Sequence, residues 1–440
     1  MIRPLAIASS GAFVAALSTS LVAISAPVIA RDLSVEPGDV SWVLTAYLLS
    51  ISCLLAFSGR LADMHGRKRI YLLGHLLFVI GSVLCAWAPV LPALIGARIC
   101  QGVGSSMTMA VGPAIITNAV PPNKRARGLG FQLAATYLGL TLGPTIGGAL
   151  SKQIGWHAVF VVIAIAGALA GLLALVFLEN DAPPAKKREL DIGGAVLLGC
   201  GLAALLVGLR RGPDHGWASG GTIAFLVFAI ITLALFVRHE RSHAEPLLPP
   251  ALFGARFSLA VLGATLLYVV TFMLSWLLPF QLQHAAHLDP QTAGAFMTSQ
   301  PATMAIVAPL SGFIADRFGA RIPTTIGMLA IGTGMALVAS AAAAPNVSLV
   351  VALGLVGVGA GLYVAPNNAS IMGAAPRDRQ STAAAIAATA RNLGMTIGIA
   401  IASTLDRPLG FRTTLYVAAA LALAGAALSG LRPVVASPAK

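Results

Sequence analysis

Two arginines draw attention first, because each falls inside a long apolar run of the sequence. At 1.5 Å of helix rise per residue, Arg98 would lie about 10 Å from the nearer end of its run and Arg391 about 15 Å from the nearer end of its own. A guanidinium in hydrocarbon is costly unless it faces water or a partner, so both are candidates for a binding role. Gln101, one turn from Arg98, and Asn392, next to Arg391, could share that role. The alternative is that each arginine is structural and donates to carbonyl groups of neighbouring helices.

Carboxylates are missing from the middle of the same runs. All fifteen Asp and Glu residues lie between the runs or near their ends. A cation site, or a relay that carries protons across such a run, normally needs a buried carboxylate. Two arginines without a buried carboxylate favour anionic, zwitterionic or neutral amphipathic ligands. If protons are carried, His75, the only histidine inside a run, and Asp39, at the end of another, are the candidates. His75 as a plain packing residue is the alternative.

The apolar runs themselves decide the class of the protein. Its 440 residues are 57% hydrophobic and 10% charged, whereas soluble domains carry about 25% charged residues. Each run can cross about 30 Å of hydrocarbon as a helix, so we predict an all-α integral membrane protein with about fourteen transmembrane helices. The runs are 5–30, 39–58, 69–88, 91–116, 129–151, 157–178, 190–209, 220–238, 257–281, 291–315, 322–342, 347–371, 381–404 and 412–431.

The charges between the runs predict the orientation of the chain. With the N-terminus in the cytoplasm, twenty Lys and Arg residues fall on the cytoplasmic side and six on the outer side. A missed span would reverse this bias in every later loop, so we expect an even number of spans and two cytoplasmic termini. The net charge of +13 comes from short clusters that form no basic domain for a nucleic acid. Short loops and no targeting signal favour the bacterial cytoplasmic membrane, in a multi-pass topology.

The sequence also repeats itself at an offset of 253 to 255 residues. Three segments recur: Gly59–Lys68 as Gly312–Arg321, Gly102–Gly104 as Gly357–Gly359, and Leu138–Gly143 as Leu393–Gly398. Duplicated six-helix halves are an arrangement known from membrane transporters, in which one bundle rocks against the other. We therefore expect an N-terminal six-helix bundle at 1–180, a two-helix insert with its flanking loops at 181–250, and a C-terminal six-helix bundle at 251–440.

Several of these segments resemble motifs of the major facilitator superfamily, and the resemblance covers nearly the whole chain. Gly59–Lys68 is similar to its loop signature, and the residues around Asp316 are similar to the second-half copy. Arg98–Gly104 fits the fourth-helix pattern R-x-x-Q-G-x-G, and Gly139–Gly148 fits the fifth-helix antiporter pattern G-x-x-x-G-P-x-x-G-G. The stretch Trp42-x-x-Thr45-Ala46-Tyr47 resembles the second helix of the fourteen-span drug:proton antiporter family, the multidrug efflux type.

This resemblance implies two six-helix bundles plus two extra helices. It also implies export of small hydrophobic or amphipathic compounds, such as drugs, dyes and metabolites, by alternating access in exchange for protons. One position departs from the pattern. The family usually carries an acidic residue in helix 1 where this chain has Ser18, so the resemblance assigns no proton carrier there.

The candidate site residues form four groups. Polar residues at depth are candidates for lining a cavity or binding substrate: Ser18, Tyr47, Arg98, Gln101, Gln132, Tyr137, Gln300, Arg391 and Asn392. Residues of the two loop signatures are candidates for a gate latch or, alternatively, for plain capping and topology: Gly59, Asp63, Gly66, Arg67, Gly312, Asp316, Gly319 and Arg321. Residues of the fifth-helix pattern would allow close helix contact and shape a cavity, or serve packing alone: Gly139, Gly143, Pro144, Gly147 and Gly148. The proton-coupling candidates are His75 and Asp39.

No enzyme constellation, metal cluster or cofactor motif is found in the sequence, and no phosphate-binding loop for ATP. The expected partners are a small-molecule substrate, protons and the lipid bilayer, with a monomer as the working unit. An importer or a uniporter without proton antiport is the main alternative to an exporter, and the missing helix-1 acid favours it. A non-transporting sensor or scaffold would need an extramembrane domain, and no loop is long enough to hold one.

Overall fold

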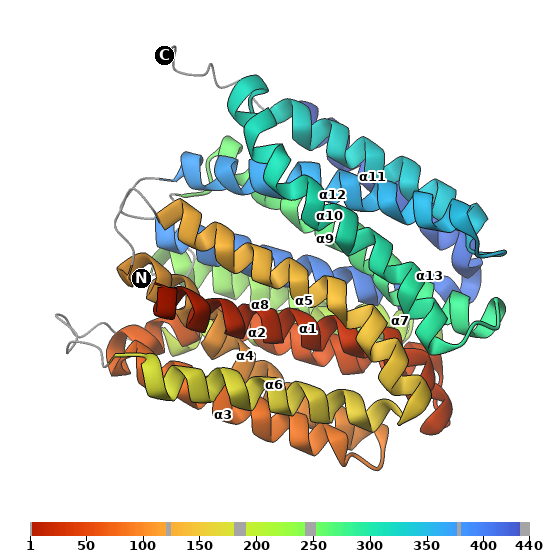
Figure 1. Cartoon of the computed structure of the whole chain (residues 1–440), viewed down its shortest axis with the longest axis horizontal. Coiled ribbons are helices and arrows are strands. Elements are labelled where there is room, and N and C mark those ends of the chain that lie inside the picture. The colour runs from red at the N-terminus through yellow and green to blue at the C-terminus, as the bar shows by residue number, and fades with distance from the viewer. Residues whose placement is uncertain (1, 120–124, 180–190, 243–251, 376–379, 432–440) are drawn as a thin grey trace. The chain divides into compact units, whose positions relative to one another are not determined.

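The computed structural model describes residues 2–119, 125–179, 191–242, 252–375 and 380–431. The side chains of a few residues within these ranges, Asp63 and Asp316 among them, lie outside what is described. The described chain is a succession of long helices joined by short connections (Figure 1).

The helices follow one another with little chain between them. Their bounds are α1 (Ile2–Asp32), α2 (Pro37–His65), α3 (Arg67–Ala86), α4 (Leu91–Ala119), α5 (Arg125–Gln153), α6 (Trp156–Phe177), α7 (Ile192–His215), α8 (Gly220–Ser242), α9 (Ala255–Phe280), the π-helix η3 (Gln281–Ala285), α10 (Pro290–Phe318), α11 (Arg321–Ala341), α12 (Val347–Ala374) and α13 (Gln380–Gly430). The last of these is two helices, because Gly410 has a φ of 74° and a ψ of 168° and interrupts the helical backbone.

The prediction of fourteen long helices is confirmed. Each predicted apolar run overlaps one helix of the described chain, and the runs 381–404 and 412–431 form the two parts of α13 on either side of Gly410. Twelve segments are long and apolar enough by themselves to cross a membrane; this count takes α13 once and does not include α10. The chain is therefore an all-α, multi-pass membrane protein.

Local sequence explains where several helices begin and end. Asp191 accepts a hydrogen bond from the backbone N–H of Gly194 at 2.7 Å and caps α7, and Asp289 caps α10 in the same way. Gly66 ends α2 with a φ of 95°, and Gly319 ends α10 with a φ of 74°. Both glycines adopt backbone conformations that residues with a Cβ rarely reach. They occupy equivalent places in the sequence repeat, so the repeated turn is a backbone requirement.

The chain forms two compact units, residues 1–247 and 248–440. In the first unit, α1 packs against α5, α4 and α6, while α3 packs against α4 and α6 and α2 packs against α4. Figure 1 shows α3 and α6 running side by side along the edge of this unit. The pair α7 and α8 forms a hairpin that contacts the rest of the unit through α2. The predicted three-part division, with an insert at 181–250, stays a prediction.

The second unit repeats the pairings of the first. Its first helix, α9, packs against α13 as α1 packs against α5, and α12 packs against both α10 and α11 as α4 packs against α2 and α3. The repeated glycines lie at matching contacts. A Cβ on Gly139 would meet the Phe13 carbonyl oxygen of α1 at 2.6 Å, and one on Gly394 would meet the Thr265 carbonyl oxygen of α9 at 2.5 Å. The repeat in the sequence therefore specifies which helices pack most closely.

Candidate functional site

Arg98 lies at the centre of a buried polar cluster in the first unit. Its side chain, on α4, is 0% exposed. The Nε atom donates to the Val43 carbonyl oxygen of α2 at 2.8 Å. The Nη1 atom donates to Ser18 Oγ of α1 at 3.2 Å and to Gln101 Oε1, one turn along α4. Three helices therefore hold this guanidinium group in one orientation.

An aromatic ring and two serines complete the cluster. The Tyr47 ring of α2 lies under the guanidinium, with its centroid 4.1 Å from Cζ. The Tyr47 and Ser105 hydroxyl oxygens are 2.8 Å apart, and Gln101 Nε2 donates to Ser82 Oγ of α3 at 2.7 Å. We call Ser18, Tyr47, Ser82, Arg98, Gln101 and Ser105 the Arg98 cluster. All six side chains are buried.

The energies of these contacts can account for a buried guanidinium that has no acidic partner among the described residues. A guanidinium at the middle of a membrane helix costs about 2.5–3.5 kcal/mol on insertion scales, and more in simulations. A hydrogen bond to a charged group contributes about 1.5–3 kcal/mol, and a desolvated cation–π contact contributes about 2 kcal/mol. Three hydrogen bonds and one such contact can offset that cost. They leave Arg98 Nη2 without a hydrogen-bond partner among the described residues.

The sequence predicted four members of this cluster, and the structure brings them together: Ser18, Tyr47, Arg98 and Gln101. The sequence did not predict Ser82 or Ser105 as members. Both serines lie in apolar runs, where a lone serine resembles an ordinary small packing residue. The available signal was spacing, because Ser105 lies one turn beyond Gln101 on the same helix.

Two further cavity candidates lie on α5 and are not joined to the Arg98 cluster by a described hydrogen bond. Gln132 is half-buried, and its Nε2 atom donates to the Ala8 carbonyl oxygen of α1 at 3.5 Å. Tyr137 is buried. Whether either residue meets a substrate stays a prediction.

The candidates of the second unit lie on α10 and α13. The Arg391 side chain, on α13, faces Tyr268 of α9. Asn392 is 2% exposed, and its Nδ2 atom has no hydrogen-bond partner among the described residues. Gln300 is half-buried on α10, and its carbonyl oxygen lies where a Cβ on Gly357 of α12 would have to be. Their role in binding also stays a prediction.

The glycines of the fifth-helix pattern form the contact between α5 and α1. A Cβ on Gly147 would meet Ile24 Cγ2 at 2.6 Å, and one on Gly143 would overlap Ser20. Ser20 Oγ donates to the Leu140 carbonyl oxygen at 3.1 Å across the same contact. Pro144, next to Gly143, and Gly148, next to Gly147, are both buried. The structure thus places the three spaced glycines in close helix packing; a role in shaping a cavity stays a prediction.

The two loop signatures are described only in part. Gly66 and Gly319 form the turns, Arg67 begins α3 and is half-buried, and Arg321 begins α11 and is exposed. Gly59 and Gly312 are half-buried on α2 and α10. Asp63 and Asp316, the predicted latch residues, lie outside the described side chains. The latch therefore stays a prediction.

The proton-coupling candidates lie apart from the Arg98 cluster. His75 is buried on α3, with the Tyr71 ring at a centroid distance of 4.8 Å and Gly171 of α6 against its Cβ. The Gly167 carbonyl group approaches the ring, but no hydrogen bond of ordinary geometry forms. Asp39 is half-buried in the first turn of α2. Neither residue contacts a member of the Arg98 cluster through a described hydrogen bond.

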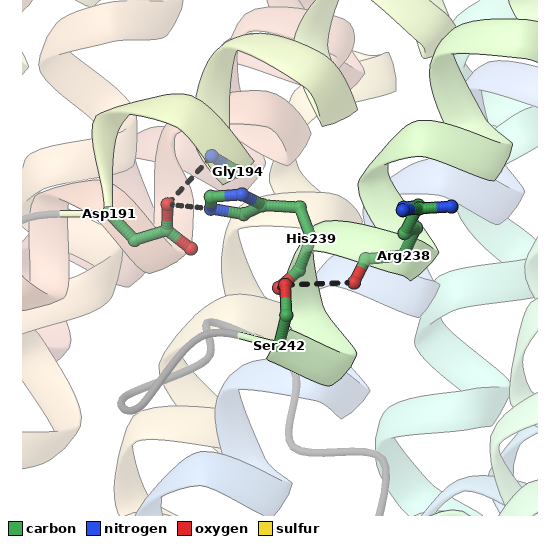
Figure 2. Close-up of polar contacts among 5 residues, drawn as sticks. All are labelled: Asp191, Gly194, Arg238, His239 and Ser242. Atoms are coloured by element: carbon green, nitrogen blue, oxygen red, sulfur yellow. Dashed lines mark hydrogen bonds and ion pairs between the residues drawn. The ribbon is translucent and has the colours of Figure 1, made fainter.

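One polar contact was not predicted at all. His239 Nε2 on α8 lies 2.7 Å from Asp191 Oδ1, the same oxygen that caps α7, and joins the two helices of the hairpin (Figure 2). Ser242 donates to the backbone of the same helix, to the Arg238 carbonyl oxygen at 3.2 Å. Asp191 is 2% exposed. Its nearness to His239 could not be predicted from two residues 48 positions apart.

Comparison with known proteins gives these sites a context. The family model described as Major Facilitator Superfamily matches residues 8–267 and 260–440. The riboflavin transporter RibZ of Clostridioides difficile (strain 630) is 32% identical over 398 residues, which are 90% of this chain and 86% of RibZ. The multidrug resistance protein Stp of Mycobacterium tuberculosis (strain CDC 1551 / Oshkosh) is 32% identical over 393 residues, which are 89% of this chain and 73% of Stp.

Solved structures agree on the fold. The xylose transporter XylE from E. coli, in a partially occluded inward open conformation, matches with a TM-score of 0.67 and 15% identity. The match covers 97% of each chain. At this level of identity the likeness concerns the fold alone.

Proposed function

Because the chain belongs to the major facilitator superfamily, we propose that it exports small hydrophobic or amphipathic compounds by alternating access, in exchange for protons. The protein is a multi-pass membrane transporter of this superfamily and not an enzyme. The proposal concerns the direction of transport, the cargo and the coupling ion.

The Arg98 cluster is the observation that supports substrate binding by the first unit. A charged side chain that is 0% exposed and held by α1, α2 and α4 is expensive to keep, so a role in binding is the default expectation. The name of Stp, a multidrug resistance protein, supports export of drug-like compounds. The fifth-helix glycine pattern supports antiport through the family resemblance.

A second candidate is favoured by one specific observation. Ser18 occupies the helix-1 position where the resemblance implies a carboxylate, and its hydroxyl accepts from Arg98 at 3.2 Å. Without that acid, a transporter could move its cargo along the cargo's own gradient, as a uniporter or an importer. The name of RibZ, a riboflavin transporter, supports a vitamin-like cargo for this alternative.

The proposal also includes orientation and assembly. Both termini are cytoplasmic in a bacterial cytoplasmic membrane, and the working unit is a monomer. Ser34, exposed between α1 and α2, then faces the outside of the cell. Ser34→Cys in a cysteine-free background should react with an impermeant maleimide in intact cells. If Ser34→Cys is labelled only after the cells are opened, the chain has the opposite orientation to the one proposed.

Inverted membrane vesicles test export and coupling together. We expect a fluorescent dye to accumulate in inverted vesicles when a proton gradient is imposed, and to stop accumulating when a protonophore removes the gradient. For a dye that carries one carboxylate, Arg98→Gln should strongly lower accumulation. Arg256→Gln is the matched control, because Arg256 is exposed at the start of α9. Accumulation that follows the dye gradient alone, with or without the protonophore, would favour the uniporter.

A further inference from the structure

The positive charge of Arg98 has no negative partner in the part of the chain that the structure describes. A guanidinium group has five N–H donors. Nε uses its one donor on Val43, and Nη1 uses two on Ser18 and Gln101. The two donors of Nη2 remain, on a nitrogen that is buried and has no described hydrogen-bond partner. The acceptors already bound are a carbonyl, a hydroxyl and an amide, and none of them carries a charge.

Among the described residues, dipoles and not charged groups compensate the charge of Arg98. The Tyr47 ring, 4.1 Å from Cζ, presents its negative face, and Gln101 is itself held in place by Ser82 of α3. Dipoles of this kind satisfy donors but leave the net charge in place. A buried donor pair on a group of full positive charge is the arrangement that recognises an anion.

We propose that Arg98 Nη2 binds a small monovalent anion, which supplies the negative charge that Ser18 does not. Two sources share this chemistry: an inorganic halide such as chloride, and the carboxylate of a cargo molecule. The cargo source rests on the proposed function, whereas the halide source does not.

The internal repeat does not place a second arginine at the position equivalent to Arg98. At the offset of 255 residues, Leu353 stands at the position equivalent to Arg98, and it is 0% exposed. Arg391, a candidate for substrate binding in the second unit, faces Tyr268 of α9 and is not a neutral control. Arg256, exposed at the start of α9, supplies the control for a variant of Arg98.

Thermal unfolding of the purified full chain in detergent tests the proposal without a transport assay. The melting temperature is measured while a bulky sulfonate, camphorsulfonate, is replaced by chloride, or by formate, at constant ionic strength. A ligand that binds only the folded chain raises Tm, and we expect a saturable rise of about 1–3 °C. A rise with chloride assigns an inorganic source; a rise with formate alone assigns a carboxylate of the cargo. Failure of export with an intact anion effect would overturn the proposed function only.

Two pairs of variants attribute the effect to Arg98. Arg98→Gln should abolish the anion-dependent rise, and Arg256→Gln should keep it. Ser18→Asp puts a carboxylate within reach of the guanidinium and should remove the anion dependence, whereas the neutral isostere Ser18→Asn should keep it. If Ser18→Asp fails to fold, the Arg98→Gln and Arg256→Gln pair decides alone. No rise in Tm with either anion, or a rise that persists in Arg98→Gln, would overturn the proposal.

Discussion

The Trp156 indole N–H donates to the Asp32 carboxylate at 2.7 Å, and this bond joins the end of α1 to the start of α6. Trp156 is 1% exposed, and its ring stacks on His157 at a centroid distance of 3.8 Å. Asp32 itself is exposed. A carboxylate at the surface thus satisfies the only polar atom of a buried aromatic side chain.

Removing this acceptor should destabilise the first unit. Asp32→Ala leaves the buried indole N–H unsatisfied, which costs about 1–3 kcal/mol, whereas Asp32→Asn keeps an acceptor oxygen and should cost less. The measurement is the melting temperature of the full chain in detergent. Trp156→Phe is the control background, because Asp32→Ala should add little to it. Equal losses in both backgrounds would mean that Asp32 acts through another contact.

A methyl group at the contact between α5 and α1 should also destabilise the protein. Gly143→Ala places a Cβ against Ser20, and overpacking of this kind costs about 1–3 kcal/mol. Gly398→Ala should behave alike in the second unit, where the Cβ meets the Val269 carbonyl oxygen of α9.

Gly96→Ala is the matched control for these two glycine variants. Gly96 lies in α4, and a Cβ there would meet nothing within 4 Å. Alanine at an open helix position should be neutral or stabilising by up to about 1 kcal/mol. Equal melting temperatures for Gly143→Ala and Gly96→Ala would show that α1 and α5 are not in close contact.

The hairpin of α7 and α8 offers a test of the capping carboxylate. Asp191→Ala removes the acceptor for the Gly194 N–H and the partner of His239, and loss of an N-cap alone costs about 0.5–2 kcal/mol. Asp191→Asn keeps an oxygen for Gly194 and should retain most of that stability. Limited proteolysis and melting temperature report the difference. If Asn and Ala are equally destabilising at this position, the carboxylate charge beside His239 matters more than the cap.

The helices were predictable because lipid solvation depends on composition alone. An apolar run of twenty residues must form its own backbone hydrogen bonds, so α1 to α13 could be located without knowledge of their neighbours. Tyr47, Arg98 and Gln101 were predictable as a group because motif and helical spacing place them at depth.

Contacts between distant residues were not predictable for a physical reason. Asp32 and Trp156 lie 124 residues apart, and Asp191 and His239 lie 48 apart. Whether such side chains meet depends on the rotation and axial position of each helix, which hydropathy does not specify. For the same reason, sequence alone could not show that Gln132 bonds to Ala8 while Arg98 bonds to Ser18.

The charged residues inside the apolar runs should decide which cargo charge the transporter prefers. Acidic side chains are absent from the middle of the apolar runs, whereas Arg98 is fully buried. A cargo with one carboxylate should therefore be transported faster than its methyl ester, and a permanent dication should be transported poorly. A charge-assisted hydrogen bond contributes about 1.5–3 kcal/mol, so Arg98→Gln should lower kcat/KM for the carboxylate cargo about tenfold or more and leave the ester nearly unchanged. Arg256→Gln should leave both rates unchanged. Rapid efflux of a dication by the wild-type protein, unaffected by Arg98→Gln, would show that cargo charge is selected elsewhere.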